Sequence, residues 1–300
     1  MTLRLATRRS PLALLQAQSV QARLRRVGVE SVLVPLETRG DRESHVDLVT
    51  LGGQGVFVVE VQRAVLAGDA DVAVHSAKDL PSATPDGLVL AAVPERVDSA
   101  DALVGRSLAG LGPGATVATG SPRRRALLLE RRPDLHVVGL RGNMATRLAA
   151  VGRDGVDAVV VAVAALERLG EAGRVSERLD PEWCVPQVGQ GALALEARVD
   201  DDATRRCLAL IHDAVAGRAV AAERAFLGEL GAGCVLPVGA HGQVRDGLVV
   251  LRGVMLSPDG AQSVRATNDG VEPVRVGADL ARHLRDEMGG GALVDATDGR

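Results

Sequence analysis

The feature that most constrains the fold of this chain is a unit that occurs twice: a short apolar strand, a Ser-Pro pair and a helical pattern. The first copy is "LRLATRRSPLALLQAQ" and the second is "TVATGSPRRRALLLERR". In each copy a serine, Ser10 or Ser121, is suited to cap the helix, with proline in the first helical position. Two such openings predict two domains of related architecture.

Strand and helix patterns alternate around both openings. In the first half, the strand patterns at 31–36 and 71–76 flank a helical pattern at 57–67. In the second half, "LHVVGL" precedes a helical pattern at 143–151, and "DAVVVAVAAL" reads as a strand running into a helix. This βαβ alternation favours a mostly parallel, doubly wound sheet in each half.

The last third of the chain has a different pattern. A helical stretch over 201–230 is followed by valine-rich runs, which are interrupted at 245–247 and at 257–260. Such interruptions are typical of hairpin turns. With a closing helix expected over 278–288, this region predicts a small α+β domain.

Composition and charge exclude several classes of protein. Three hundred residues are enough for two or three domains with cores of their own. A net charge of −3 gives no overall attraction to nucleic acid or to a membrane surface, and two Phe, one Trp and no Tyr argue against recognition by stacking on bases. No apolar run has the length of a membrane span.

The N-terminus and the cysteines indicate the compartment. "TRRSPLALLQAQ" is superficially similar to a twin-arginine export signal, but its apolar run covers only 11–15. Because a hydrophobic region and a cleavage site of the signal-peptide type are missing, we expect a cytoplasmic protein. Cys184, Cys207 and Cys234 are widely spaced, which excludes a disulfide framework and shows no zinc-binding spacing.

Basic and glycine-rich segments cluster at the ends of the predicted strands. These segments are Arg8-Arg9-Ser10, Arg39-Gly40-Asp41, Gly52-Gly53-Gln54-Gly55, Ser121 with Arg123, Arg124 and Arg125, and Arg141-Gly142-Asn143 with Arg147. Ligands of open α/β sheets bind at the carboxyl ends of strands, where helix N-termini and arginine forks favour anions. The clusters together predict a ligand with several anionic groups.

Lys78 is the only lysine among 35 basic residues, and it stands beside Asp79 in "DVAVHSAKDLP". One hypothesis is a two-lobed anion receptor. Another is a Schiff-base enzyme that uses Lys78, for example with pyridoxal phosphate, although Asp79 would keep the lysine protonated. If the segment is extended, the two side chains point to opposite sides. The glycines at 52, 53 and 55 lack the context of a nucleotide site.

Six segments together resemble one family. "ATRRSPLAL", "VHSAKDLP", "SPRRR", "RGNMATRL", "VGQGALALE" and "GAGCVLPVG" occur in the order and spacing of porphobilinogen deaminases, also called hydroxymethylbilane synthases. The resemblance implies a transferase that joins four porphobilinogen units head to tail with loss of ammonia. It then releases the linear tetrapyrrole, the precursor of porphyrins and haem, by hydrolysis.

The resemblance also implies a cofactor and an architecture. The cofactor is a dipyrromethane held by a thioether to a cysteine, which by motif is Cys234, and no metal is implied. The fold implied is α/β, with two doubly wound domains like those of periplasmic binding proteins and a small α+β third domain. The boundaries are 1–94 with 192–209 for the first domain, 97–190 for the second and 212–300 for the third. A cytoplasmic monomer with no nucleic-acid or membrane partner is expected.

Individual roles follow from the matched motifs. Asp79 corresponds to the catalytic aspartate: a fixed negative charge stabilises the cation left on the substrate when ammonia departs, and a carboxylate can move protons. The substrate carries an acetate and a propionate, which accounts for the many basic residues. The residues implied to contact the cofactor are Cys234, Lys78, Ser121, Arg123, Arg124, Arg141, Ser76 and Asp41. Those implied to contact the substrate are Arg8, Ser10, Arg147, Arg168, Phe57 and Gln190.

The glycine-rich segment departs from the family pattern. Thr50, Gln54 and Val59 stand where many relatives carry lysines. This departure argues against a cationic role for the segment, and the lysine at 78 persists without those neighbours.

Overall fold

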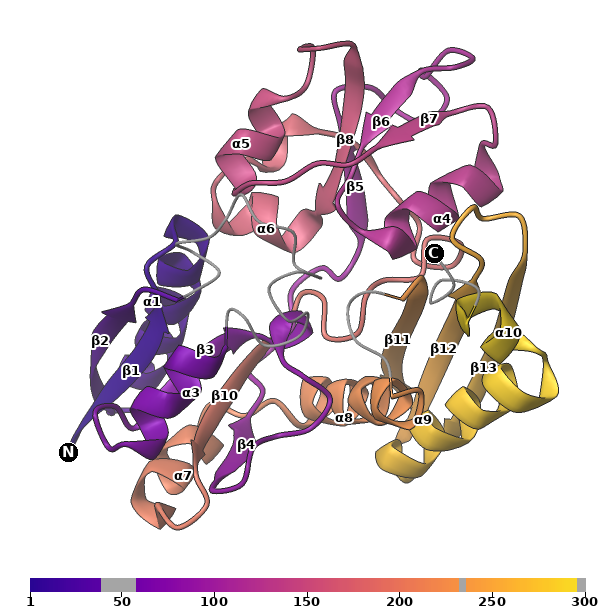
Figure 1. The fold of residues 1–300 in the computed structure, drawn as a ribbon. Coiled ribbons are helices and arrows are strands. Elements are labelled where there is room, and N and C mark those ends of the chain that lie inside the picture. The colour runs from indigo at the N-terminus through magenta and orange to yellow at the C-terminus, as the bar shows by residue number, and fades with distance from the viewer. Residues whose placement is uncertain (39–57, 232–235, 296–300) are drawn as a thin grey trace.

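The computed structural model describes residues 1–38, 58–231 and 236–295. Three β-sheets with their helices form three units that meet around the centre of the molecule (Figure 1). Two sheets have five strands and the third has three. Within the described ranges, no helix has the length and apolar character needed to cross a membrane.

The first lobe is built on a sheet with the strand order β2-β1-β3-β10-β4. Strand β1 is parallel to β2 and to β3, whereas β10 runs antiparallel between β3 and β4. The chain thus returns to this sheet after building the second one. The elements are β1 (Thr2–Arg8), α1 (Pro11–Arg26), β2 (Glu30–Leu36), α3 (Val59–Leu66), β3 (Val72–Ser76), β4 (Leu88–Ala92), β10 (Leu193–Arg198) and α7 (Asp202–Ala209).

The second lobe repeats this arrangement in the order β7-β6-β8-β5-β9. Strand β6 is parallel to β7 and β8, and β5 is antiparallel to both of its neighbours. The elements are β5 (Asp101–Val104), β6 (Thr116–Ala118), α4 (Pro122–Arg131), β7 (His136–Val138), α5 (Met144–Ala149), β8 (Val156–Ala162), α6 (Val163–Arg168) and β9 (Val175–Arg178). The predicted pair of related lobes is therefore confirmed.

Helices cover both faces of each five-stranded sheet, as a doubly wound fold requires. In β1, Leu3 and Leu5 pack with residues of α1, whereas Ala6 packs with residues of α3 on the other face. This division follows from the alternation of side chains along a strand. In the second lobe, Val117 and Ala118 of β6 likewise belong to two separate cores.

Both predicted helix caps are present. Ser10 Oγ accepts a hydrogen bond from the Ala13 amide at 3.4 Å, and Ser121 Oγ accepts one from the Arg124 amide at 3.4 Å. Each helix begins with the proline that follows its serine. The Ser-Pro pairs therefore fix where the first helix of each lobe starts.

The third unit is a small antiparallel sheet of β11 (Val238–Arg245), β12 (Leu248–Leu256) and β13 (Ser263–Gly270), with α8 (Ala214–Glu229), α9 (Pro273–Arg282) and α10 (Gly290–Asp295). Both predicted hairpins are confirmed. The helical stretch expected over 201–230 is instead two helices, because Asp213 caps a new one by accepting from the Ala216 amide at 2.8 Å. The closing helix starts five residues earlier than expected, at Pro273.

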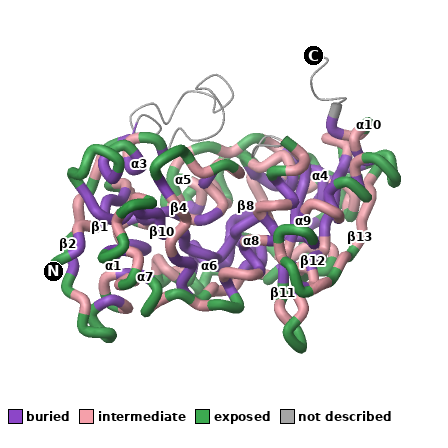
Figure 2. The backbone as a smooth tube through the Cα atoms, turned by 90° about the horizontal axis from the view of Figure 1, so that it is seen from below, coloured by how far each residue is buried: buried purple, intermediate pink, exposed green. Residues whose placement is uncertain are grey.

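The third unit shares apolar cores with both lobes. Val254 and Leu256 of β12 pack in the same core as Leu127 of α4. Val220 of α8 packs with Leu80, just beyond β3. Figure 2 shows the buried residues as a band through the interior of all three units. The fold class predicted, two doubly wound lobes and a small α+β unit, is the one observed.

Candidate functional site

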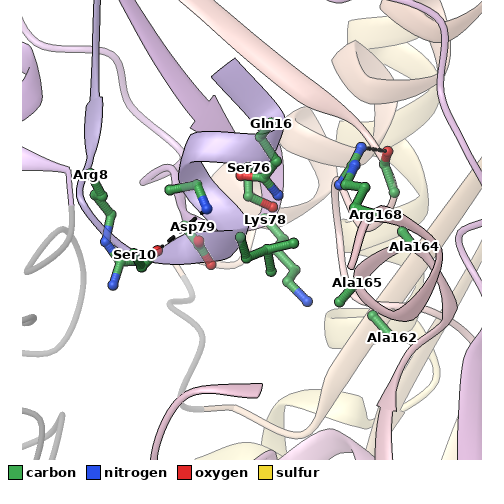
Figure 3. Close-up of a pocket in the computed structure, with 13 residues that line it drawn as sticks. Arg8, Ser10, Gln16, Ser76, Lys78, Asp79, Ala162, Ala164, Ala165 and Arg168 are labelled. Atoms are coloured by element: carbon green, nitrogen blue, oxygen red, sulfur yellow. Dashed lines mark hydrogen bonds between the residues drawn. The ribbon is translucent and has the colours of Figure 1, made fainter. Parts of the chain in front are cut away.

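A cavity lies where the two lobes face each other. From the first lobe it is lined by the end of β1, the start of α1 and the end of β3, and from the second lobe by the junction of β8 and α6. Its lining brings together six of the predicted site residues, namely Arg8, Ser10, Ser76, Lys78, Asp79 and Arg168 (Figure 3). Gln16, Ala162, Ala164, Ala165 and Gly191 are further lining residues, which the sequence did not single out.

The turn after β3 presents Lys78 and Asp79 to this cavity. Residues Ala77–Asp79 form a single 3-10 turn rather than an extended segment. The extended segment on which the expectation of opposite sides depended is therefore not present, and both residues line the same cavity (Figure 3). A Cβ at Gly189, where φ is +71°, would lie 2.9 Å from the Lys78 amide nitrogen, so the "GQG" segment can pack directly behind this turn.

Lys78 is held across the lobes. Its Nζ donates to Gln190 Oε1 at 3.3 Å. The pKa of Lys78 is lowered to about 8, mainly by burial and secondly by the positive charge of Arg124, against the opposing effect of Asp79 and Asp101. At neutral pH the side chain remains mostly a cation that titrates just above the physiological range.

Asp101, which the sequence did not single out, is a buried residue bonded to predicted site residues. It is fully buried at the start of β5, and its Oδ2 accepts from Arg123 Nη2 at 2.6 Å while its Oδ1 accepts from Arg124 Nη2 at 2.7 Å. Burial alone would raise the pKa of Asp101, but the two guanidinium groups outweigh it and hold the pKa well below its usual range. An acidic residue inside the apolar run "SADALV", in a chain with an arginine triplet, was the available signal.

Gln190 connects this pair to Lys78. Its side chain is fully buried, and Nε2 donates to Ser99 O and to Asp101 Oδ1, both at 2.8 Å. Its Oε1 accepts from Arg124 Nη2 at 3.3 Å in addition to the bond from Lys78. All the polar atoms of this amide are thus bonded inside the protein. A direct contact of Gln190 with a ligand stays a prediction.

Arg123 is buried in the same way, being 3% exposed. Its Nη1 donates to the carbonyl oxygen of Val185 at 2.6 Å, in addition to the bond from Nη2 to Asp101. Its predicted contact with a ligand carboxylate also remains a prediction, and the described contacts give it a part in fixing Asp101.

Arg147 and Arg168 approach from the second lobe. Asn143 caps α5 by accepting from the Thr146 amide at 3.0 Å, and Arg147 Nε donates to Gly142 O at 2.9 Å. Burial lowers the pKa of Arg147, helped by the charge of Arg124. Arg168 Nη2 donates to Gly191 O at 2.9 Å, and burial lowers its pKa to about 10.

The charges of the site fit a ligand with several carboxylates. Lys78, Arg124 and Arg147 are close enough for their positive charges to disfavour one another, as the direction of their influence on pKa shows. Among the described residues that line the cavity, Asp79 is the one carboxylate. Anionic groups of a bound ligand would relieve this repulsion and form charge-assisted hydrogen bonds.

Some predictions fall on residues that the structure does not describe. Asp41, Phe57 and Cys234 lie outside the described residues, as do Thr50 and Gln54. Of the other cysteines, Cys184 is buried, with its pKa raised to about 12 by burial and by the Asp101 charge, and Cys207 is partly buried. In the described part of the chain, no group of three or more His, Cys, Asp or Glu residues is arranged to hold a metal.

Two lobes of one topology, with a cavity rich in cations between them, define a two-lobed α/β protein that binds an anionic ligand between its lobes. Residues 3–206 match the family model of the porphobilinogen deaminase dipyromethane cofactor binding domain, and residues 218–286 match that of the porphobilinogen deaminase C-terminal domain. The chain belongs to the porphobilinogen deaminase family.

Curated relatives agree over nearly the whole chain. The chain is 44% identical to the porphobilinogen deaminase of Deinococcus radiodurans, with 98% of each chain covered. It is 46% identical to that of Syntrophotalea carbinolica, over 88% of this chain and 86% of the relative. Among solved structures, the methionine-binding protein MetQ is 14% identical with a TM-score of 0.44, over 70% of this chain and 89% of that one.

Membership of the family gives the chain its activity. It is a transferase, with the hydroxymethylbilane synthase activity of porphyrin and tetrapyrrole biosynthesis. Its cofactor is the dipyrromethane after which the first family model is named. The cation-rich cavity described above suits such a group, because each of its rings carries carboxylates.

Proposed function

We propose that the cavity between the lobes condenses four molecules of porphobilinogen, one at a time and with loss of ammonia, and that Asp79 is the catalytic residue. The observation that carries this proposal is the placement of one carboxylate, Asp79, among cationic side chains from both lobes in a single cavity. Such a site combines a group that can stabilise positive charge with groups that bind the acidic substituents of the substrate.

Asp79 has two tasks in this proposal. Its carboxylate provides a fixed negative charge beside the substrate carbon that becomes cationic as ammonia leaves. It also lies where it can accept a proton from the substrate and return it, provided that substrate groups come within hydrogen-bonding distance. The turn Ala77–Asp79, packed against the segment of Gly189, holds the carboxylate at the cavity.

The cationic residues hold carboxylates in this proposal. The groups assigned to the substrate are Arg8, Ser10, Arg147, Arg168, Phe57 and Gln190, and those assigned to the cofactor are Lys78, Ser76, Ser121, Arg123, Arg124, Arg141 and Asp41. When bound, the dipyrromethane supplies the pyrrole carbon to which the first substrate unit is joined. We assign its thioether to Cys234, which lies between α8 and β11 along the chain.

We further propose three domains and a cytoplasmic monomer. The domains are 1–94 with 192–209, 97–190 and 212–300, and the support for them is that each contains the strands of one sheet. The chain crosses between the first two domains near Arg96 and again near Gln190. These two crossings are joined by a hydrogen bond of 2.8 Å from Arg96 Nε to Gln190 O.

Two experiments test these assignments. The intact mass of the wild-type protein is expected to exceed its sequence mass by two pyrrole units, and Cys234→Ser is expected to have its sequence mass alone. If both proteins have only their sequence masses, the covalent attachment is wrong.

Asp79→Ala is expected to fold and to carry the cofactor but to lose turnover by about a thousandfold or more, as for loss of a main electrostatic group. Asp86→Ala, which removes an exposed aspartate of the same lobe, is the matched control and should retain full activity. The rate of ammonia release measures both. Substantial turnover by Asp79→Ala would remove Asp79 from the catalytic role.

A further inference from the structure

We propose that Asp101 is a positioning residue for the reaction: its buried carboxylate fixes Arg124 and, through Gln190, sets the place and the charge of Lys78 at the cavity. This inference rests on the proposed function, in which Lys78 and Arg124 bind carboxylates. Asp101 itself touches no part of the cavity.

Asp101 lies in the sheet next to the strand that ends at the cavity. In the pairing of β5 with β8, Asp101 lies directly opposite Ala162, which lines the cavity at the end of β8. Asp101 is therefore one strand behind the cavity wall. A charge at this depth acts on the cavity through its bonding partners, and it is shielded from solvent because the residue is fully buried.

Most of the hydrogen-bond donors of Arg124 are taken by acceptors within the protein. Of the five N–H groups of a guanidinium, Asp101 Oδ1 takes two, from Nε at 3.0 Å and Nη2 at 2.7 Å. Val160 O takes one from Nη1 at 3.1 Å, and Gln190 Oε1 takes one from Nη2 at 3.3 Å. At most one donor of Arg124 is left for a ligand. Arg124 therefore acts on a ligand mainly through a fixed charge.

Gln190 connects Asp101 to Lys78. The Gln190 amide is bonded through Nε2 to Asp101 and through Oε1 to Lys78 Nζ, at 2.8 and 3.3 Å. Asp101 belongs to the second lobe and Lys78 to the first, so this chain of bonds crosses between the lobes. The orientation of Gln190, and with it the acceptor for Lys78, depends on the carboxylate of Asp101.

Charged groups from both lobes influence the protonation of Lys78. Among the described residues, Arg124 and Arg147 oppose the protonation of Lys78, and Asp79 and Asp101 favour it. Removal of the charge of Asp101 takes away one of these favourable effects and leaves both opposing ones in place. Lys78 should then lose its proton at a lower pH and bind carboxylates only in more acidic solution.

The test compares Asp101→Asn with Asp134→Asn. The first substitution keeps the shape of the side chain and removes its charge, and the second does the same to a surface partner of Arg132 in the same lobe. For Asp101→Asn we expect a KM at least tenfold higher, and a loss of kcat/KM at alkaline pH that begins about one pH unit lower than in the wild type. Asp134→Asn should match the wild type in both measurements.

A second variant moves the charge instead of deleting it. The double variant Asp101→Asn/Gln190→Glu places a carboxylate beside Lys78 Nζ, opposite an amide instead of the Asp101 carboxylate, and should return the alkaline loss of kcat/KM toward the wild-type pH. The double variant should also recover most of the loss in KM, which a role in folding alone does not predict. If Asp101→Asn does not fold, the double variant, which keeps one negative charge beside Arg124 and Lys78, is the variant to measure.

The outcomes separate the two proposals. If the wild type carries no covalent adduct, the proposed cofactor site fails before Asp101 is considered. If the wild type is loaded and active, and Asp101→Asn has an unchanged KM and pH profile, the positioning role is overturned while the proposed function stands. The positioning role is likewise overturned if the double variant recovers neither the KM nor the wild-type position of the alkaline limb.

Discussion

At the scale of single residues, the choice of lysine at position 78 has a physical consequence. Arginine keeps its charge at every physiological pH, whereas the ammonium of Lys78, with its pKa lowered to about 8 mainly by burial, titrates just above the physiological range. A modest change in the charges around Lys78 can therefore remove its proton and weaken its binding of a carboxylate. A site that must bind a growing chain and later release it can use such a group.

This reasoning predicts the behaviour of Lys78→Arg. In the wild type, Lys78 is charged below its pKa of about 8, so kcat/KM, which reports the free enzyme, should fall as pH rises through that value. In the variant the alkaline fall should disappear, because a guanidinium does not titrate there. We expect kcat/KM at pH 7 to drop about tenfold, equivalent to one charge-assisted hydrogen bond.

The control for this variant is Arg25→Lys, which introduces a lysine on the exposed end of α1 and should leave the pH profile unchanged. The measurement is kcat/KM for porphobilinogen between pH 6 and 10. An alkaline fall that persists in Lys78→Arg would assign it to a group other than Lys78.

Site residues that stand beside strand ends could be predicted from the sequence, and those that act from behind the cavity could not. Arg8, Ser10 and Lys78 each follow or end a strand, and the carboxyl ends of such strands meet at one edge of a sheet. Asp101 acts through contacts between segments that are distant along the chain, and Gln190, although its motif marked it as a site residue, was not expected to bond to Asp101. Neither a motif nor a periodicity encodes such a contact.

At the scale of elements, the "RGN" segment shows how the sequence fixes the residue at which the short helix α5 begins. Gly142 has φ +102°, and a Cβ there would lie 2.7 Å from Thr146 Cγ2. Asn143 then caps α5, and Gly142 O accepts the bond from Arg147 Nε. Gly142 and the Asn143 cap thus together orient the side chain of Arg147.

We predict that Gly142→Ala lowers the free energy of unfolding by about 1–3 kcal/mol, because it combines backbone strain with a clash against Thr146. The displaced turn should also raise KM through Arg147. Gly152→Ala is the matched control: its φ is also positive, at +76°, but nothing lies within 4 Å of the added Cβ. Urea unfolding and steady-state kinetics measure both, and equal effects of the two variants on KM would contradict the aiming role.

Element boundaries could be predicted where a local signal marks them. The Ser-Pro caps gave the start of α1 and α4 correctly, because cap and proline act within one turn of the chain. The break between α7 and α8 was missed, since an apolar helical pattern continues through it and Asp213 acts as a cap only once the chain turns there. Periodicity alone does not reveal such a break.

At the scale of the whole molecule, one buried carboxylate joins all three units. Glu223 of α8 is fully buried and accepts from Arg96 Nη1 at 2.6 Å, from the Gly189 amide at 2.6 Å and from the Gly242 amide at 2.7 Å. Arg96 and Gly189 lie in the two crossings between the lobes, and Gly242 lies in β11. Glu223 therefore ties both crossings to the third unit.

We predict that Glu223→Gln lowers stability by about 3–5 kcal/mol, because it leaves the buried charge of Arg96 without its partner and opposes an amide donor to backbone N–H groups. Glu229→Gln, on the same helix but with Arg282 and Arg285 as surface partners, should cost about 1 kcal/mol or less. Hydrogen exchange should become faster at the amides of Gly189 and Gly242 in the first variant only. Equal exchange in both variants would mean that the crossings are held together by apolar packing, with no special part for Glu223.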